Sequence, residues 1–182
     1  MAFREFMLSL PFPFRTQPVA TPYAGQSSIT HRLRKAVITD LPMIYRGERD
    51  YIQRWEPSHE DGWLRQTERH LASWVEHFDR IVLATVDEQF AGYCLWMPED
   101  GRALLCTIGV SAPYRCKGIG AALLKAYTDD ARQAGFAHLT LSVREDNPAK
   151  RLYEKAGFTQ TAVDANGYLR FEWVTSYRHA AD

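Results

Sequence analysis

The most informative stretch of this chain is VSAPYRCKGIGAALL, residues 110–124. It predicts the end of a strand, a basic turn with Gly118 and Gly120, and a helix that begins directly after the turn. The first N–H groups of a helix have no partner within the helix, and the helix dipole makes that end positive. Glycine also lets a ligand approach the backbone closely. The stretch therefore predicts a phosphate or pyrophosphate site, beside which Arg115 and Lys117 add positive charge.

Two common phosphate-binding motifs do not fit these residues. A P-loop needs Gly-Lys followed by Ser or Thr, which this chain lacks. The dinucleotide fingerprint G-x-G-x-x-G needs a third glycine, but Leu123 stands three residues after Gly120. A glycine pair that serves only a tight turn is the alternative interpretation.

The hydrophobic patterns elsewhere predict one mixed α/β domain over residues 31–178. Short β-branched and aromatic runs favour strands, whereas apolar residues at i, i+3 and i+4 favour helices. Asn166-Gly167 is the strongest hairpin signal. Strands are expected at 31–37, 81–86, 90–96, 103–110, 138–143, 158–164 and 168–175, and helices at 40–55, 60–78, 118–134 and 147–156.

Composition excludes several classes of protein. The 182 residues carry 22 basic and 22 acidic side chains, so no net charge favours nucleic acid or anionic lipid. No apolar run is long enough for a transmembrane helix, and we expect no membrane partner and no metal. The three cysteines are expected to be free thiols in a cytoplasmic protein. Residues 1–30 hold four of the nine prolines and are expected to form an extended or disordered arm.

Two segments of the chain, RCKGIG at 115–120 and NPAKRLYEKAGF at 147–158, together resemble the GNAT family of N-acetyltransferases. Residues 115–120, Arg-Cys-Lys-Gly-Ile-Gly, match the family signature [Arg/Gln]-x-x-Gly-x-[Gly/Ala]. Residues 147–158, NPAKRLYEKAGF, look like its second motif. The resemblance covers about 31–175 and implies the acyl-CoA N-acyltransferase fold, a mostly antiparallel central sheet flanked by about four helices. It also implies acetyl-CoA as co-substrate.

The resemblance implies roles for particular residues. The pantetheine arm would run along the strand at 108–110, where the family has a bulge that Gly109 suits. The family strands on either side of the glycine-turn helix splay apart, and Tyr153 would protonate the leaving thiolate. Core packing is the alternative for Tyr153. The expected cofactor-binding residues are Ile108, Gly109, Val110, Arg115, Cys116, Lys117, Gly118, Ile119, Gly120, Ala121, Asn147 and Tyr153.

The general base and the acceptor are less well defined. Some relatives carry a carboxylate on the central strand, but residues 104–107 of this chain are Leu-Leu-Cys-Thr. Glu99, Asp100 and Glu145 are possible substitutes, and each is also explained as a surface charge. Acidic and aromatic residues at 48–68 indicate either a cleft for a cationic amine or a solvated helix face. This acidic set comprises Glu48, Asp50, Glu56, Glu60, Asp61 and Glu68.

These observations favour an acetyl-CoA-dependent N-acetyltransferase that acts on a primary amine by direct attack. The acceptor is expected to be a small-molecule amine, a peptide N-terminus or a lysine. The alternative is a catalytically idle module that senses acyl-CoA, because the strand carboxylate is missing. The sequence leaves a homodimer open.

Overall fold

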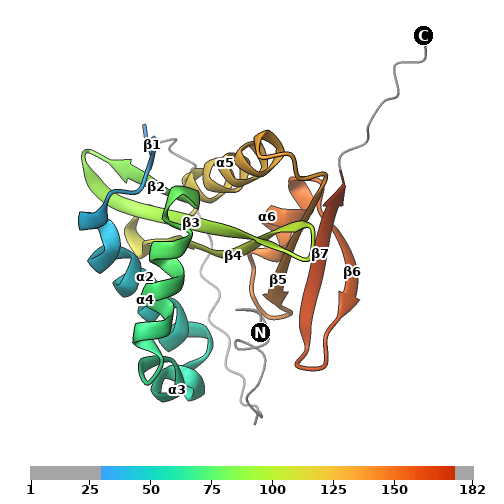
Figure 1. Cartoon of the computed structure of the whole chain (residues 1–182), viewed down its shortest axis with the longest axis horizontal. Coiled ribbons are helices and arrows are strands. Elements are labelled where there is room, and N and C mark those ends of the chain that lie inside the picture. Colours follow the sequence, from blue (N-terminus) through green and yellow to red (C-terminus); the bar gives the residue numbers. More distant parts are fainter. Residues whose placement is uncertain (1–29, 175–182) are drawn as a thin grey trace.

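Seven strands form one sheet in the computed structural model, which describes residues 30–174 (Figure 1). The order across the sheet is β1-β2-β3-β4-β5-β7-β6. Neighbours are antiparallel except β4 and β5, which are parallel, so the expected mostly antiparallel α/β fold is confirmed. The strands are β1 (Arg32–Lys35), β2 (Ile81–Val86), β3 (Gln89–Glu99), β4 (Arg102–Val110), β5 (His138–Arg144), β6 (Thr159–Val163) and β7 (Tyr168–Val174).

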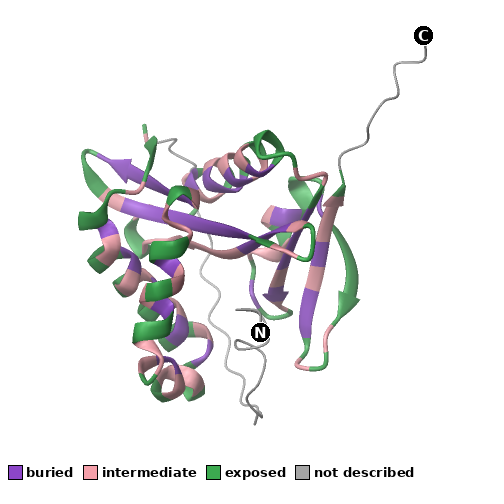
Figure 2. Ribbon diagram, in the orientation of Figure 1, coloured by how far each residue is buried: buried purple, intermediate pink, exposed green. Residues whose placement is uncertain are grey.

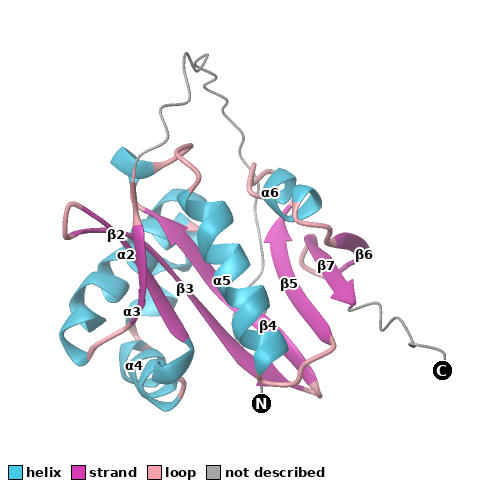
Figure 3. Ribbon diagram, turned by 90° about the horizontal axis from the view of Figure 1, so that it is seen from above, coloured by secondary structure: helices cyan, strands magenta, loops and turns pink. Residues whose placement is uncertain are grey.

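Helices cover both faces of this sheet (Figure 3). The helices are α2 (Leu41–Trp55), α3 (Glu60–Leu64), α4 (Thr67–Glu76), α5 (Ile119–Gln133) and α6 (Lys150–Lys155). α5 and α6 pack on one face, where buried residues such as Leu123 and Leu141 form the larger core. α2, α3 and α4 pack on the other face around Ile52, Trp74 and Tyr93. Figure 2 shows the buried strands between these two layers.

Two predicted helices differ from the observed ones in their bounds. The helix expected at 60–78 is broken into α3 and α4, where the hydroxyl of Thr67 donates a hydrogen bond to the Leu64 carbonyl at 2.7 Å. The helix expected at 147–156 begins only at Lys150, because Oδ1 of Asn147 accepts the N–H of Ala149 at 2.9 Å in a turn ahead of it. Local side-chain hydrogen bonds therefore set both bounds.

The hairpin predicted at Asn166-Gly167 joins β6 and β7. Gly167 has a φ of 81°, and Oδ1 of Asp164 accepts the N–H groups of Asn166 and Tyr168. Within residues 30–174 no helix is long and apolar enough to cross a membrane. The predicted arm at 1–30 lies, except for its last residue, outside the described part of the chain.

β4 and β5 pair over only a short stretch, from Ala103 to Leu105 on β4 and from Leu139 to Leu141 on β5. Beyond these residues the two strands no longer pair, as expected for a splayed pair. The backbone edge of β4 that follows Leu105 is therefore without a β5 partner. A ligand that can form hydrogen bonds is the natural complement of such an edge.

The irregularity in β4 lies at Cys106, so the prediction of a bulge at Gly109 is wrong. The register between β3 and β4 shifts at Cys106, which has no partner of its own on β3, whereas Gly109 pairs regularly with Tyr93. Glycine is favoured at 109 for another reason. An ideal Cβ there would lie 3.1 Å from Cε1 of Tyr93, so the missing side chain makes room for the tyrosine ring.

Candidate active site

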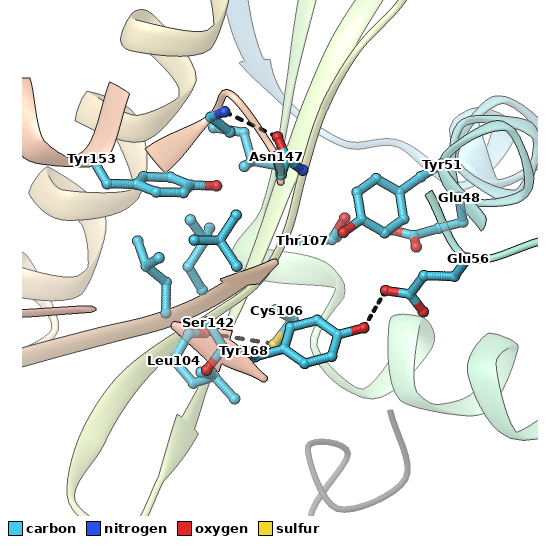
Figure 4. Close-up of a pocket in the computed structure, with 15 residues that line it drawn as sticks. Glu48, Tyr51, Glu56, Leu104, Cys106, Thr107, Ser142, Asn147, Tyr153 and Tyr168 are labelled. Atoms are coloured by element: carbon cyan, nitrogen blue, oxygen red, sulfur yellow. Dashed lines mark hydrogen bonds between the residues drawn. The ribbon is translucent and has the colours of Figure 1, made fainter. Parts of the chain in front are cut away.

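A cavity opens where β4 and β5 separate, and it reaches across the sheet edge to the end of α2 (Figure 4). Its apolar wall comes mainly from the two strands, which also contribute Thr107 and Ser142. The other polar groups come from α2 and the residue after it, from the loop before α6, and from α6 and β7. The lining residues are Glu48, Tyr51, Glu56, Leu104, Leu105, Cys106, Thr107, Ile108, Leu141, Ser142, Val143, Asn147, Ala149, Tyr153 and Tyr168. Of the residues predicted from the sequence to bind cofactor, Ile108, Asn147 and Tyr153 line this cavity.

The predicted phosphate loop lies between β4 and α5. Cys116 and Gly118 both have left-handed backbone conformations, with φ of 59° and 86°. Such a conformation costs a non-glycine residue about 1 kcal/mol, and it bends the chain sharply into the helix. The first helical hydrogen bond runs from the N–H of Ala122 to the carbonyl of Gly118 at 3.1 Å. The N–H groups of residues 119–121 thus precede the helical ladder and are oriented for an anion.

The side chain of Arg115 has a structural contact within this loop. Its Nε donates to the carbonyl of Val110 at 2.9 Å, which ties the loop to the end of β4. Its backbone N–H donates to the carbonyl of Ala112 at 3.4 Å. The donors that the turn presents therefore begin after Arg115, with Lys117 as a half-buried neighbouring cation.

Gly120 lies where the start of α5 meets α6. An ideal Cβ at this position would be 3.4 Å from Cδ2 of Leu152 and 3.8 Å from Cγ2 of Val110. A methyl group would therefore fit in ordinary van der Waals contact, whereas a branched side chain would fill the space between α5, α6 and the end of β4. The glycine keeps that space open beside the cavity.

Tyr153 projects from α6 into the cavity (Figure 4). Its ring packs against Phe158 and Phe171, with centroid distances of 6.4 and 6.1 Å, so the core-packing interpretation describes the ring correctly. The residue is only 4% exposed, and burial raises the pKa of its phenol. Within residues 30–174 the hydroxyl makes no hydrogen bond, and the raised pKa keeps its proton on the phenol, where it is available to a bound group.

Asn147 is buried at the loop between β5 and α6. Its Oδ1 is occupied by the N–H of Ala149, which fixes the orientation of the amide. The amide NH₂ is then the group that can donate to a ligand in the cavity. This orientation suits a contact with a carbonyl of an extended cofactor arm.

Glu48 lies on α2 at the far wall of the cavity and is only 6% exposed. Its Oε1 accepts a short hydrogen bond from the hydroxyl of Tyr93, which lies 3.5 Å from Oγ1 of Thr107. Burial raises the pKa of the Glu48 carboxyl, against the opposing effect of hydrogen bonds from Tyr93 and Thr107. The sequence held a signal for this placement, because Glu48 falls midway between Ile44 and Ile52 at i+4 spacing on the buried stripe of α2.

Glu56 follows α2 and is 3% exposed. Its Oε1 accepts a hydrogen bond from the hydroxyl of Tyr168 at 2.5 Å, and its Oε2 lies 3.3 Å from Nδ1 of His59. The first contact joins residues that lie 112 positions apart in the sequence. The hydrogen bond between Glu56 and Tyr168 thus connects the end of α2 to β7 beside the cavity.

The acidic set predicted at 48–68 divides in two. Glu48 and Glu56 face the cavity, as a cleft for a cation would require. The others do not line it: Glu60 accepts from Nε of Arg49 at 2.9 Å, and Asp50, Asp61 and Glu68 are exposed.

The three proposed substitute bases lie outside the cavity. Glu99 and Asp100 line a separate polar depression at the β3–β4 turn, and Glu145 is exposed. Cys106 lines the main cavity, but burial raises the pKa of its thiol well above the usual value. A protonated thiol is a poor nucleophile, which agrees with a transfer that uses no acyl-enzyme. Within the described residues no group of His, Cys, Asp and Glu could hold a metal ion.

A model of the acetyltransferase (GNAT) family matches residues 46–158. That range contains both expected motifs, the cavity walls from α2, β4 and β5, and all of α5 and α6. Because the match covers more than half of the chain, this protein belongs to the GNAT family.

Curated relatives support the assignment. The chain is 28% identical over 131 residues to ribosomal protein bS18-alanine N-acetyltransferase of Salmonella typhimurium, covering 71% of this chain and 82% of that one. It is 31% identical over 98 residues to mycothiol acetyltransferase of Clavibacter sepedonicus, covering 53% of this chain and 32% of that one. The chain therefore spans about a third of the length of the mycothiol acetyltransferases that it matches.

Solved structures show the same fold. The PaiA N-acetyltransferase of Thermoplasma acidophilum, solved with coenzyme A, superposes with a TM-score of 0.69 at 19% identity, covering 81% of this chain and all of the other. The ribosomal-protein-S18-alanine N-acetyltransferase of Escherichia coli superposes with a TM-score of 0.59 at 25% identity, covering 80% and 94% of the two chains.

Proposed function

We propose that this protein transfers the acetyl group of acetyl-CoA to a primary amine by direct attack. The observation that carries the proposal is the early end of β4–β5 pairing next to the N-terminus of α5. A pyrophosphate at the N–H groups of residues 116–121 and an arm along β4 would place the thioester in the cavity. The buried phenol of Tyr153 lies there.

In this proposal, some residues bind the cofactor and another transfers a proton. The α5 N-terminus and Lys117 supply positive potential for the pyrophosphate. The free edge of β4 from Cys106 to Val110 supplies backbone groups for the arm, and the amide of Asn147 donates to it. The Tyr153 phenol donates its proton to the departing sulfur. A thiol is about 1.5 pKa units more acidic than an ordinary phenol, so this transfer costs about 2 kcal/mol on its own, and it is completed when the nitrogen proton restores the phenol.

The names of the relatives point to different acceptors, so they support a class of acceptor and not a single compound. One relative is named for the acetylation of an alanine of a ribosomal protein and another for mycothiol. We propose a primary amine of a small molecule, a peptide N-terminus or a lysine as the acceptor of this chain. The two buried carboxylates in the cavity support a basic acceptor.

Two measurements test the proposal together. Calorimetry with acetyl-CoA reports binding, and thiol release with a panel of amines, amino acids and alanine-initiated peptides reports transfer. We expect both. Binding without thiol release across the panel would favour the acyl-CoA sensor, and absence of binding would contradict the placement of the cofactor.

A variant pair locates the cofactor site. Gly120→Val should lower the affinity for acetyl-CoA at least about tenfold, because its branched side chain fills the space between α5 and α6. Ala134→Val adds similar bulk at the opposite, exposed end of α5 and serves as the control. Unchanged affinity in Gly120→Val, with melting like that of the control, would remove the pyrophosphate from this turn.

A further inference from the structure

Glu48 and Tyr153 reach the same cavity from opposite walls (Figure 4). Glu48 comes from α2 on one face of the sheet, and Tyr153 comes from α6 on the other. Both side chains are more than nine-tenths buried. The Tyr153 hydroxyl makes no hydrogen bond with a described residue and points into the space between the two side chains. A carboxylate and a phenol that face each other across an acyl-transfer cavity are suited to a base and an acid.

The Glu48 carboxylate is held rigidly. Its partner Tyr93 is confined between two glycines: an ideal Cβ at Gly47 would lie 2.9 Å from Cε1 of the ring, and one at Gly109 would lie 3.1 Å from the same atom. The ring therefore fills the space that two missing side chains leave between α2 and β4. Its hydroxyl is thereby fixed on Glu48, beside Thr107. Tyr93 is a positioning residue for this carboxylate.

Glu48 differs from Glu56 in its electrostatic surroundings. Glu56 has His59 at 3.3 Å, and Arg144 is close enough for their charges to interact. The groups that act most strongly on the charge of Glu48 are Tyr93, Thr107 and Glu56, and none of these is a cation. The titratable groups that face it are Tyr51 from α2, Glu56 beyond the end of α2, Tyr93 from β3 and Cys106 from β4. A buried carboxylate that is surrounded by acidic and neutral groups is stabilised as an anion when a ligand brings a cation to it.

We propose that Glu48 is the acceptor-binding base of this site: it binds the ammonium group of the acceptor and takes the proton that must leave before nitrogen can attack. This inference rests on the proposed acetyl transfer. It assigns the base to α2, on the acceptor side of the cavity, and not to the central strand or to the β3–β4 turn. It also restricts the acceptor to amines that are cationic when they enter.

The proton and electron balance of the step is simple. One proton of the R–NH₃⁺ acceptor passes to the Glu48 carboxylate, and the nitrogen lone pair forms a bond to the thioester carbon. The C–S bond breaks with its electron pair on sulfur, which takes the Tyr153 proton. The second nitrogen proton restores the Tyr153 phenol, and Glu48 loses its proton to water. The sum is one amide, one free thiol and one proton.

Turnover gives the first test. The probe is an alanine-initiated tripeptide amide, and Glu48→Gln should lower its kcat/KM at least about 100-fold, as expected for loss of a general base. Acetyl-CoA affinity should stay unchanged. Glu145→Gln, an exposed carboxylate outside the cavity, is the control and should leave turnover unchanged. A Glu48→Gln enzyme within about threefold of wild type, or an equal loss in Glu99→Gln, would overturn the proposal.

The pH profile separates a base from a merely structural carboxylate. In the wild type, kcat/KM should fall toward low pH as Glu48 becomes protonated, and Glu48→Gln should lack this limb. The hydrogen bond from Tyr93 holds the pKa of Glu48 down against burial, so Tyr93→Phe should move the acidic limb to higher pH. This second variant keeps the ring and tests the proposal even where Glu48→Gln folds poorly. An acidic limb that stays in place in Tyr93→Phe would contradict the assignment.

A binding experiment distinguishes failure of this inference from failure of the proposed function. Calorimetry compares the tripeptide amide with its propionyl counterpart, in which hydrogen replaces the ammonium group. The wild type should prefer the ammonium form, and Glu48→Gln should lose that preference. If the preference is present but no acetyl is transferred, the proposed function fails and the cation site stands. If acetyl is transferred without any such preference, the inference about Glu48 fails alone.

Discussion

Replacing Tyr153 by Phe is a direct test of the proposed acid, because the structure separates the ring from the hydroxyl. The ring packs at 6.4 Å from Phe158 and 6.1 Å from Phe171, and these contacts survive the change. The hydroxyl makes no hydrogen bond with residues 30–174, so its removal breaks none in this part of the chain. We expect the free energy of unfolding to change by less than about 1 kcal/mol.

The catalytic effect should be much larger than the effect on stability. A positioned general acid contributes about 10²–10⁴-fold, and the low end applies because a coenzyme thiolate is already a fair leaving group. We expect kcat to fall about 10- to 100-fold, which corresponds to about 1.4–2.7 kcal/mol of activation free energy. Acetyl-CoA affinity should be nearly unchanged, because the phenol acts mainly in the transition state. Burial raises the pKa of Tyr153, so the phenol should stay protonated at neutral pH. Its ionisation should therefore not lower kcat there.

Single-turnover measurement of amide formation is the suitable assay, since it removes product release from the rate. Tyr127→Phe is the matched control. Its hydroxyl donates to the carbonyl of Ala103 at 2.8 Å and lies 3.3 Å from the carbonyl of Thr140, away from the cavity. That change should lower stability by about 1–3 kcal/mol and leave the chemical step unchanged. A Tyr153→Phe enzyme with an undiminished single-turnover rate would leave Tyr153 as a packing residue.

Three further predictions concern the scaffold. Hydrogen bonds from Arg34 hold the pKa of Asp40 below its usual value, so its contribution to stability is present above the unfolded pKa of about 3.9 and is lost as pH falls through the folded pKa. Asp40→Asn should therefore lower Tm at pH 7 and have little effect near pH 2, and equal losses would contradict this. An ideal Cβ at Gly92 would lie 2.5 Å from the Gly109 carbonyl oxygen, so Gly92→Ala should cost about 1–3 kcal/mol by chemical denaturation. Deleting residues 1–29 should leave Tm and acetyl-CoA affinity nearly unchanged, and a Tm loss of many degrees would show that they pack on the domain.

Local signals in the sequence predicted most of the fold. Asn166-Gly167 predicted its hairpin because both residues tolerate left-handed backbone. The turn before α5 was predicted from Gly118 and Gly120, of which Gly118 has a left-handed conformation. Alternating runs of β-branched residues predicted the meander of β2, β3 and β4. Each of these features depends on residues close together in the chain.

Features that depend on distant residues were predicted poorly. Gly109 was interpreted as a bulge, because a glycine in a strand often marks one. Its actual constraint is the ring of Tyr93, which lies on the neighbouring strand and also packs against Gly47. The real irregularity falls on Cys106, whose side chain gives no comparable signal. The sequence alone does not predict which side chain of a neighbouring strand packs against a glycine.

The carboxylates of α2 show how burial changes an interpretation. In the sequence, Glu48 and Glu56 stand among arginines and fit either a cleft for a cationic amine or a solvated helix face. Their side chains are buried because the apolar stripe of α2 carries Glu48 inward, and the contact between Glu56 and Tyr168 holds the end of the helix against β7. The period of the helix could have placed the first residue, but the second needed the tertiary fold.

The same interruption of the sheet explains why a binding site exists here at all. Pairing between β4 and β5 ends at Leu105 and Leu141, so the following backbone groups of β4 have lost the neighbour that would satisfy them. Buried backbone groups without partners cost stability comparable to a lost hydrogen bond each. An extended ligand with amide groups repays that cost when it lies along the edge, whereas a compact apolar ligand does not. The edge of β4 is therefore suited to an elongated, amide-bearing donor such as the proposed one, and in the proposed mechanism Glu48 and Tyr153, at the end of that edge, act on the acceptor and on the leaving sulfur.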